Sequence, residues 1–239
     1  MTAVELVGAA KIFADAEINA SLRVESGQQL VLLGPSGCGK TTVLRMIAGL
    51  LEPDAGQVLF DGEPMSGVPP ENRNAAMVFQ AHALFPFRTV AENVAYGLKL
   101  RKVRADERAD RTAQALCAVH LDGYGDRWPA DLSSGERQRV ALARAVVIEP
   151  RVLLLDEPLS SLDPLLRQEL QQLICQIQQD LGITSVFVTH DRNEARAVGD
   201  QVAVMLAGKV CQIDTPAQVF AAPVAADVAA FLGTPLAAW

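Results

Sequence analysis

The stretch GPSGCGKTT at residues 34–42 constrains the fold of this chain more than any other. It has the spacing G-x-x-x-x-G-K-T and follows a short apolar run, Gln29 to Leu33, that is typical of a buried strand. Apolar residues then recur at helical spacing, at Val43, Ile47, Leu50 and Leu51. A strand, a glycine-rich turn and a helix in this order predict a phosphate-binding loop.

The residues of this loop indicate how it would hold a nucleotide. Backbone N–H groups from Gly37 to Lys40 would surround the β-phosphate at the N-terminus of the helix. Lys40 would neutralise oxygens of the β- and γ-phosphates, and the Thr41 hydroxyl would bind Mg²⁺. A glycine-rich turn formed by chance is the alternative, and the flanking strand and helix argue against it. The candidate ATP contacts of the loop are Gly34, Pro35, Ser36, Gly37, Cys38, Gly39, Lys40, Thr41 and Thr42.

Three further polar residues follow apolar strands. Asp156 ends the run VLLLD, a position that suits a ligand of Mg²⁺ in an open α/β sheet. Glu157 comes next and is placed to accept a proton from an attacking water. An isolated glutamate would be a solvated loop residue, but the apolar strand and the phosphate loop favour catalysis. His190 ends the run VFVTH and is a candidate donor to a γ-phosphate, although a lone histidine is more often structural.

Strand and helix patterns alternate along the chain, which predicts an α/β fold. Strands are expected at 57–60 with a turn at Asp61-Gly62, at 75–79, at 151–155, at 184–189, and as a pair within 201–213 turning at Ala207-Gly208. The segment from about 89 to 149 is predicted to be mostly helical. Helix starts are predicted by caps at Thr89 with Glu92, Ser133 with Glu136, Asp163-Pro164, Asp191 with Glu194, and Thr215-Pro216. The helix from Asp163 should end near Gly182.

The segment LSSGERQR, residues 132–139, has two interpretations. In the simpler one, Ser133 and Glu136 form a capping box at the start of a helix. In the functional one, Ser133, the free N–H groups and the helix dipole receive a γ-phosphate. The loop at 34–42 already surrounds its own nucleotide, so this second turn would serve another one.

Composition excludes several functions. The chain has 239 residues and a formal net charge of −7, which argues against binding to nucleic acid. The basic stretch at 101–111 is interleaved with acidic residues and is interpreted as a solvated helix face. The four cysteines form no C-x-x-C pair, so no zinc or redox motif is indicated and reduced thiols are expected. His82 and His120 are interpreted as surface or packing residues. The N-terminus has no signal pattern, and no stretch reaches the length of ~20 apolar residues that spans a bilayer.

Taken together, these segments resemble the ATP-binding cassette (ABC) family over nearly the whole chain. The family's glutamine loop matches VFQ, which ends at Gln80, and its signature LSGGQ matches LSSGE at 132–136. The Walker B strand matches LLLDE, the D-loop matches SLD, which ends at Asp163, and the switch histidine matches His190. Phe13 falls where the family places an aromatic ring that stacks on adenine. Ser134 replaces the first signature glycine and Glu136 replaces glutamine, which adds a negative charge to this turn.

The resemblance implies a site shared between two subunits. Such cassettes act as head-to-tail dimers, in which each ATP lies between the phosphate loop of one copy and the signature turn of the other. The implied trans contacts are Ser133, Ser134, Gly135, Glu136 and Asp163. The implied Mg²⁺ contacts are Thr41, Gln80 and Asp156, and the implied catalytic residues are Glu157, His190 and Gln80.

The resemblance also implies an architecture: a P-loop NTPase core with an N-terminal antiparallel β-lobe and an inserted helical lobe. We expect one ABC ATPase domain over 1–239, with the core and β-lobe at about 1–88 and 150–239 and the helical lobe at about 89–149. The chain ends near the point where many relatives continue into a regulatory β-domain, so regulation by such a domain is not expected.

The function implied is that of an ATP-hydrolysing importer subunit, similar to those for iron, polyamines, oxyanions, thiamine or phosphonates. Its expected partners are a second copy of itself, two integral-membrane permease subunits, and an extracytoplasmic solute-binding protein that acts with the permease. Its expected place is the cytoplasmic face of the membrane. A non-transport cassette that acts on nucleic acid or ribosomes is the alternative, which the net acidity disfavours.

The stretch ALFPFRTV, Ala83 to Val90, is the expected permease contact. It is unusually apolar for a connector and follows Gln80, which would sense Mg²⁺ and the γ-phosphate. An exposed aromatic cluster is a suitable interface anchor. Burial in the core is the alternative.

Overall fold

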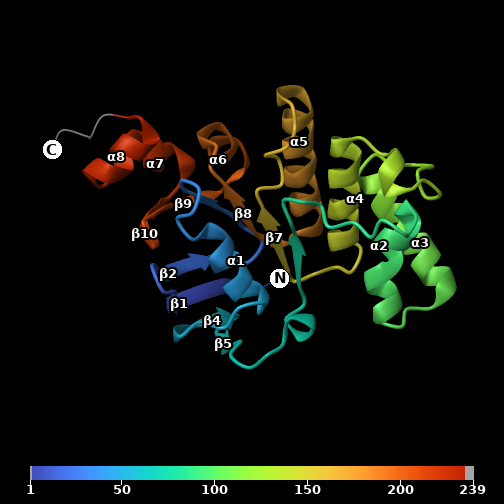
Figure 1. Cartoon of the computed structure of the whole chain (residues 1–239), viewed down its shortest axis with the longest axis horizontal. Helices are drawn as coiled ribbons and strands as arrows, with labels where there is room; N and C mark the ends of the chain where they lie inside the picture. The colour runs from blue at the N-terminus through green and yellow to red at the C-terminus, as the bar shows by residue number, and fades with distance from the viewer. Residues whose placement is uncertain (1, 235–239) are drawn as a thin grey trace.

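The computed structural model describes residues 2–234, and these form one ten-stranded mixed sheet with helices on both faces (Figure 1). The strand order is β5-β4-β1-β2-β10-β9-β3-β8-β7-β6. The strands are β1 (Val4–Ile12), β2 (Glu17–Val24), β3 (Gln29–Leu33), β4 (Ala55–Phe60), β5 (Glu63–Pro64), β6 (Ala75–Val78), β7 (Val152–Asp156), β8 (Thr184–Thr189), β9 (Gln201–Leu206) and β10 (Lys209–Asp214). The α/β class predicted from the alternation of patterns is confirmed.

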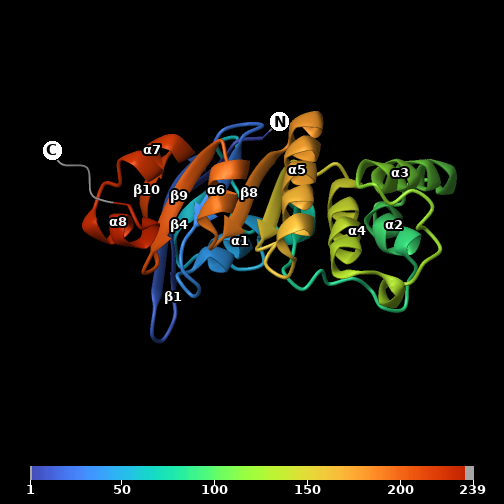
Figure 2. The ribbon, with the colours of Figure 1, turned by 90° about the horizontal axis from the view of Figure 1, so that it is seen from above.

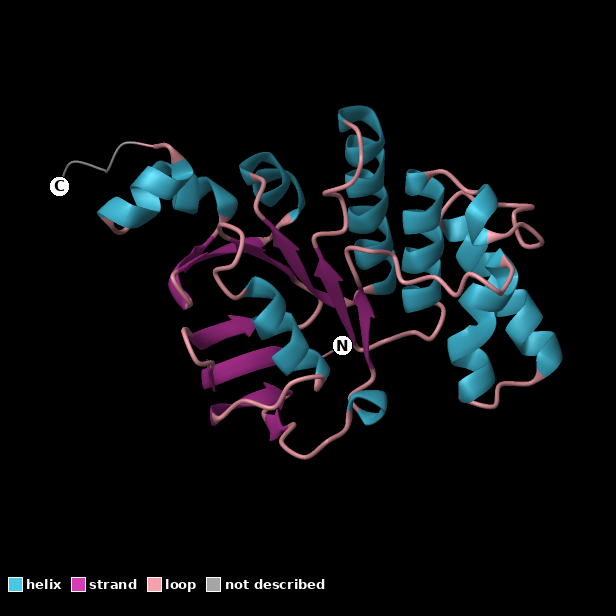
Figure 3. Ribbon diagram, in the orientation of Figure 1, coloured by secondary structure: helices cyan, strands magenta, loops and turns pink. Residues whose placement is uncertain are grey.

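The sheet changes character along its width. Strands β6, β7, β8, β3 and β9 pair with one another in parallel, whereas β1, β2, β4 and β5 form antiparallel pairs. The two parts join through β10, which pairs with β9 and, at Lys209 and Asn19, with β2. The expected antiparallel β-lobe is therefore an extension of the central sheet (Figure 3).

Alternate residues of the parallel strands face two separate cores, which is why these strands are apolar throughout. Leu30 and Leu32 of β3 pack with α1 (Lys40–Ala48) and the antiparallel strands. Val31 and Leu33 pack on the opposite face, with residues of the remaining helices. These are α2 (Val90–Leu100), α3 (Ala105–Ala118), α4 (Ser134–Val146), α5 (Pro164–Leu181), α6 (Arg192–Val198), α7 (Pro216–Ala221) and α8 (Ala226–Leu232).

The segment predicted to be helical contains α2, α3 and α4, which pack on one another beside the sheet (Figures 1 and 2). Helix α5 lies between α4 and the sheet, and α7 and α8 lie at the opposite end of the molecule. No helix among residues 2–234 combines the length and the apolar character that crossing a membrane requires.

Most predicted element starts and turns are confirmed. Closed capping boxes begin α2 at Thr89 and α4 at Ser133, and Asp163 caps α5, which ends at the left-handed Gly182. The hairpin turns at Asp61-Gly62 and Ala207-Gly208 have positive φ, as two-residue hairpin turns require.

Four details were predicted wrongly or missed. Helix α1 stops at Ala48, because Gly49 takes a left-handed conformation, so Leu50 lies outside the helix and is 51% exposed. The strand expected to reach Phe79 ends at Val78. Asp191 caps α6, but Glu194 bonds to Thr189 instead of closing the box. Helix α8 was not predicted. Of the C-terminal stretch expected to end the cassette, residues 235–239 lie outside the described part.

Candidate functional site

The loop between β3 and α1 has a backbone that only glycine permits at two positions. A Cβ atom on Gly34 would lie 2.2 Å from the carbonyl oxygen of Met205 in β9. Gly39 has φ of +107°, and a Cβ atom there would lie 2.4 Å from Cδ1 of Ile18 in β2. The glycines therefore allow the loop to pack closely against the sheet while its N–H groups remain at the start of α1.

Lys40 is held inside this loop. Its side chain is 4% exposed, and Nζ donates to the carbonyl oxygens of Gly34 and Pro35, each at 2.9 Å. The same nitrogen lies 3.8 Å from Oε1 of Glu157. A buried ammonium group is costly unless it is bonded, so these contacts fix the charge where a phosphate would meet it.

Thr41 and Asp156 form a pair of oxygen ligands. Oγ1 of Thr41 donates to Oδ1 of Asp156 at 2.9 Å across the space between α1 and β7. Burial raises the pKa of Asp156, because a charged carboxylate loses solvation there. A hydroxyl and a buried carboxylate at one point are donors of the kind that Mg²⁺ prefers, so the donor set fits this cation.

Glu157 directly follows β7 with a left-handed backbone, φ +45°. Its N–H donates to the carbonyl oxygen of Val188 at 3.1 Å, which ties this residue to β8. Its carboxylate lies between Lys40 and His190, whose Nδ1 is 3.3 Å from Oε2. A left-handed non-glycine residue persists only where surrounding contacts determine it, and such residues cluster at active sites.

Gln80 reaches the same group through a residue that the sequence did not single out. Nε2 of Gln80 donates to Oγ of Ser160 at 3.2 Å, and this hydroxyl donates to the carbonyl oxygen of Glu157 at 3.1 Å. The structure thus brings together Gln80, Lys40, Thr41, Asp156, Glu157 and His190, which come from four separate stretches of the sequence. Their assignment to catalysis or to Mg²⁺ remains a prediction.

The signature turn is a separate feature, in which Ser133 is exposed, Ser134 and Glu136 are half-buried and Gly135 is buried. Oγ of Ser133 accepts from the Glu136 N–H at 3.3 Å, and Oε2 of Glu136 accepts from the Ser133 N–H at 2.7 Å. The second bond is the main cause that lowers the pKa of Glu136. Within residues 2–234, no hydrogen bond or ion pair connects positions 133–136 with the phosphate loop, and the N–H groups of Ser134 and Gly135 have no partner. The chain alone therefore leaves two donors free at the start of α4.

Two other predicted contacts are exposed as well. Phe13, in the turn between β1 and β2, is 46% exposed, and the same hairpin contributes Ile18 to the floor under Gly39. Asp163 accepts from the N–H groups of Leu165 and Leu166 as the cap of α5. Their roles toward a nucleotide are untested by this geometry.

The stretch from Ala83 to Val90 is partly buried and partly exposed. Leu84 packs against the core, whereas Phe87 is 90% exposed. Phe85 lies with its ring centre 4.7 Å from that of Tyr96 in α2. Both aromatic rings of the stretch are exposed, Phe87 more than Phe85, whereas Leu84 is partly buried against the core, and the permease contact stays a prediction.

The turn before this stretch is held by α4, a connection that the sequence analysis missed. His82 and Ala83 both have positive φ, and the side chain of His82 bonds to Gln138. Arg144 donates to the carbonyl oxygens of His82 at 3.0 Å and of Ala83 at 2.8 Å. His82 is therefore a packing residue, as interpreted, and its partners tie the segment after Gln80 to the signature helix.

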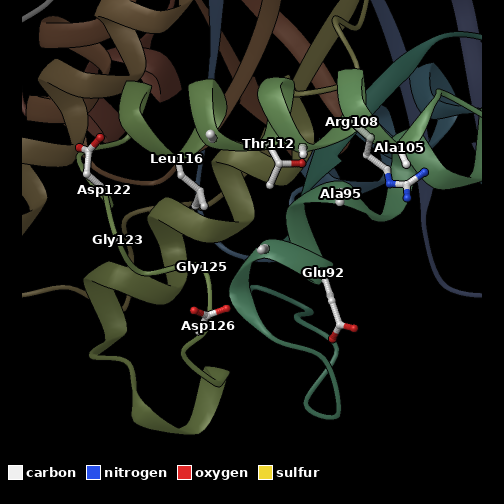
Figure 4. A pocket seen from close by; sticks show the side chains of 13 residues that line it. Glu92, Ala95, Ala105, Arg108, Thr112, Leu116, Asp122, Gly123, Gly125 and Asp126 are labelled. Atoms are coloured by element: carbon white, nitrogen blue, oxygen red, sulfur yellow. The ribbon is translucent and has the colours of Figure 1, made fainter.

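A hollow of about 570 Å³ opens beside this stretch, between α2, α3 and the loop at 122–126 (Figure 4). Its walls are small or apolar residues such as Ala95 and Leu116, and Glu92, Arg108, Asp122 and Asp126 lie around it. The Thr112 hydroxyl is buried against it without a partner among the described residues. An unpartnered buried hydroxyl favours an occupant that brings a hydrogen-bonding group.

Comparison with known proteins gives one consistent result. The sequence model of the family described as "ABC transporter" matches residues 18–160. The chain is 53% identical over 213 residues to the spermidine/putrescine import ATP-binding protein PotA of Methylococcus capsulatus, covering 89% of this chain and 55% of that protein. It is 50% identical over 215 residues to the Fe(3+) ions import ATP-binding protein FbpC of Brucella abortus, covering 90% of this chain and 61% of that protein. The chain therefore spans less than two thirds of these relatives.

Two solved structures share the fold across nearly the whole of both chains. One is cbiO1 from Clostridium perfringens, part of the ABC transporter complex cbiONQ, with a TM-score of 0.83, 31% identity, and coverage of 91% of this chain and 90% of that one. The other is the ATP-binding cassette MJ0796 as a dimer bound to ADP and Pi, with a TM-score of 0.78, 30% identity, and coverage of 90% and 99%. With the family match spanning more than half of the sequence, these likenesses show that the chain belongs to the ABC transporter family.

Proposed function

We propose that this chain binds and hydrolyses ATP as the energising subunit of an importer. The observation that supports this best is the grouping around Glu157, whose carboxylate lies 3.8 Å from Lys40 and 3.3 Å from His190, next to the Thr41–Asp156 pair. A base beside a buried cation and a histidine is suited to attack by water on a terminal phosphate.

The proposed chemistry uses each of these groups once. Glu157 accepts a proton from water as its oxygen attacks the γ-phosphorus, and the bond to the β-phosphate oxygen breaks to give ADP and phosphate. Lys40 neutralises charge on the β- and γ-phosphate oxygens, and His190 donates to the γ-phosphate. Thr41, Asp156 and Gln80 would hold Mg²⁺, which when bound offsets the charge that develops on the phosphates. Phe13 would stack on the adenine.

We propose that a second copy completes the site. The free N–H groups of Ser134 and Gly135, the Ser133 hydroxyl and the dipole of α4 form a suitable receptor for a γ-phosphate. Because no hydrogen bond or ion pair among residues 2–234 joins this turn to the phosphate loop of its own chain, the nucleotide that it receives would belong to the other copy, with Asp163 nearby. The dimer named for MJ0796 and the importer names of PotA and FbpC support this reading.

The remaining parts of the assignment are proposals of the same kind. Residues 1–88 and 150–239 would act as the catalytic core with its β-lobe, and 89–149 as a helical lobe. The chain would lie at the cytoplasmic face of a membrane, held there by two permease subunits, and an extracytoplasmic solute-binding protein would act with the permease.

We place the permease contact at the exposed Phe87 and at the hollow between α2 and α3, whose lining begins at Ala91. A short helix with small residues would fit between Ala95 and Leu116, and a donor on it would satisfy Thr112. Basic side chains on that helix would meet Glu92, Asp122 and Asp126 at the rim. This proposal extends the predicted contact stretch from the loop into the helical segment.

Co-purification with the permease tests this placement. Phe87→Ala should weaken assembly and transport, because it removes the proposed contact with the permease. Basal ATPase activity should stay at the parent level, because a ring that is 90% exposed contributes nothing to the core. Leu100→Ala is the matched control, since Leu100 is 66% exposed at the far end of α2. Full retention of permease binding by Phe87→Ala, or equal losses in both variants, would contradict the placement.

A further inference from the structure

A layer of polar residues lies directly behind the turn that carries His190. The hydroxyl of Thr189 donates to Oε2 of Glu194 at 2.5 Å and accepts from the Asp191 N–H at 2.9 Å. Thr189 is 2% exposed and Glu194, on α6, is 4% exposed. The two residues that flank His190 are thus fixed by one buried hydroxyl, whose orientation depends on the carboxylate of Glu194.

One arginine links this layer to the segment expected to contact the second copy. Nη2 of Arg167, in the first turns of α5, donates to the carbonyl oxygen of Leu162 at 2.9 Å. Its Nη1 lies 3.7 Å from Oδ2 of Asp191, and its Nε lies 3.7 Å from Oε1 of Glu194. A single guanidinium group therefore spans from the residue before Asp163 to the turn that holds His190.

The link is incomplete in the isolated chain. Nε of Arg167 is buried and has no hydrogen-bond partner among the described residues, although Glu194 is its nearest carboxylate. A cavity of about 40 Å³ lies between these side chains, Glu157, Ser160 and His190. A buried donor facing a buried acceptor beyond bonding distance, with space between them, is an arrangement that a small displacement would close.

We infer that Arg167 and Glu194 are positioning residues that connect the segment 161–163 to His190. This inference rests on the proposed function, in which that segment contacts the nucleotide of the second copy. A displacement of the Leu162 carbonyl oxygen would move the guanidinium group, close the bond from Nε to Glu194, and hold Thr189 and the turn behind His190. His190 would then take its catalytic geometry beside Glu157 only when the other copy is in place. Neither Arg167 nor Glu194 touches the reacting atoms.

The test combines three substitutions with a matched control. Arg167→Gln removes the guanidinium group. Glu194→Gln keeps an acceptor for Thr189 but removes the negative charge, and Thr189→Val removes the hydroxyl while keeping the shape of the side chain. Arg111→Gln is the control, because Arg111 in α3 also joins a carbonyl oxygen, that of Val147, to carboxylates, those of Glu107 and Glu149, and none of these residues belongs to the proposed site. Steady-state ATPase, ATP affinity and thermal melting are measured for each.

Each of the three variants should lose roughly tenfold to hundredfold in kcat, because catalysis is sensitive to displacements near 1 Å. ATP affinity and KM should stay within about twofold, and Thr189→Ser should restore the rate, since it returns the hydroxyl. In a His190→Ala background, Arg167→Gln should cause no further loss, because residues that act through one group are not additive. Arg111→Gln should retain the parent rate in either background.

Two results would overturn the inference: parent-level kcat in Arg167→Gln and Thr189→Val, or an undiminished additional loss in the His190→Ala background. A Glu194→Gln variant that fails to fold leaves the decision to Arg167→Gln and Thr189→Val. If the proposed roles of His190 and Glu157 are wrong, the pattern is different, because His190→Ala and Glu157→Gln would then hydrolyse ATP at the parent rate. Loss in those two variants with none in Arg167→Gln refutes the inference alone.

Discussion

The phosphate loop and the signature turn both present backbone N–H groups at a helix N-terminus. Only in the phosphate loop are the neighbouring polar side chains buried and bonded within the same chain. Lys40 is buried and bonded to Gly34 and Pro35, and Asp156 holds Thr41. In the signature turn, Ser133 and Glu136 bond to each other, and the N–H groups of Ser134 and Gly135 have no partner among residues 2–234. In the proposed dimer, the phosphate loop would be organised by the fold of one chain, and the signature turn would depend on assembly.

Glu157→Gln should cause the largest loss of ATPase activity, and it tests the residues around the phosphate loop. The amide keeps the shape of the side chain but cannot take a proton from water, so kcat should fall by ~10²–10⁴ while ATP still binds. Turnover and retained ATP by the purified variant measure both effects. Glu149→Gln, a change of an exposed glutamate outside the site, should leave both at the parent level. Near-normal turnover in Glu157→Gln would remove this residue from the role of base.

Phe13→Ala should have a smaller effect, confined to binding. Stacking on a base is worth ~1–3 kcal/mol in nucleic-acid complexes, so nucleotide affinity should fall by about that amount while stability without nucleotide changes little. Titration with a fluorescent ATP analogue measures the change. Ile12→Ala is the control, since Ile12 is 64% exposed in the same hairpin. Equal affinity in Phe13→Ala and the parent would leave Phe13 without a role in binding.

Glu136→Gln should have the smallest effect and sharpens the comparison at the signature turn. Removing this charge should favour the contact with a γ-phosphate by no more than about fivefold, since two unit charges about 4 Å apart in water interact by ~1 kcal/mol. The ATP concentration needed for half-maximal hydrolysis measures this. Weaker binding of ATP by the variant would contradict the assignment of position 136 to the contact.

The same substitution should reduce stability with a definite pH dependence. Because the folded-state pKa of Glu136 is lowered by the Ser133 N–H, its carboxylate stabilises the fold above the unfolded pKa, near 4.3, and this contribution is lost as pH falls. Near neutral pH, Glu136→Gln should cost a partly exposed helix start ~0.3–1 kcal/mol, and the difference should shrink below about pH 4. Urea unfolding at both pH values measures it. An equal cost at both would exclude the carboxylate as its source.

The sequence predicted the residues around the phosphate loop, but it did not predict the residues that hold them in place. Lys40, Thr41, Asp156 and Glu157 lie beside strands or in a glycine-rich turn, where short local patterns determine position. Ser160, Arg167 and Glu194 act through contacts between segments distant in sequence, which no local pattern encodes. Glu194 had a pattern, three residues after Asp191, but burial directed its carboxylate to Thr189. The continuity of the β-lobe with the central sheet likewise depends on one long-range pairing, between Lys209 and Asn19.

Mixing two inactive variants tests most directly whether the signature turn serves the nucleotide of another copy. Lys40→Ala disables the phosphate loop and Ser133→Arg blocks the signature turn. In a head-to-tail mixed dimer both lesions fall in one composite site, and the other site is intact. ATP hydrolysis measured across mixing ratios should therefore rise to a maximum near an equal mixture, above either variant alone. A rate that stays at the weighted mean of the two pure variants at every ratio would contradict assembly of the site from two chains.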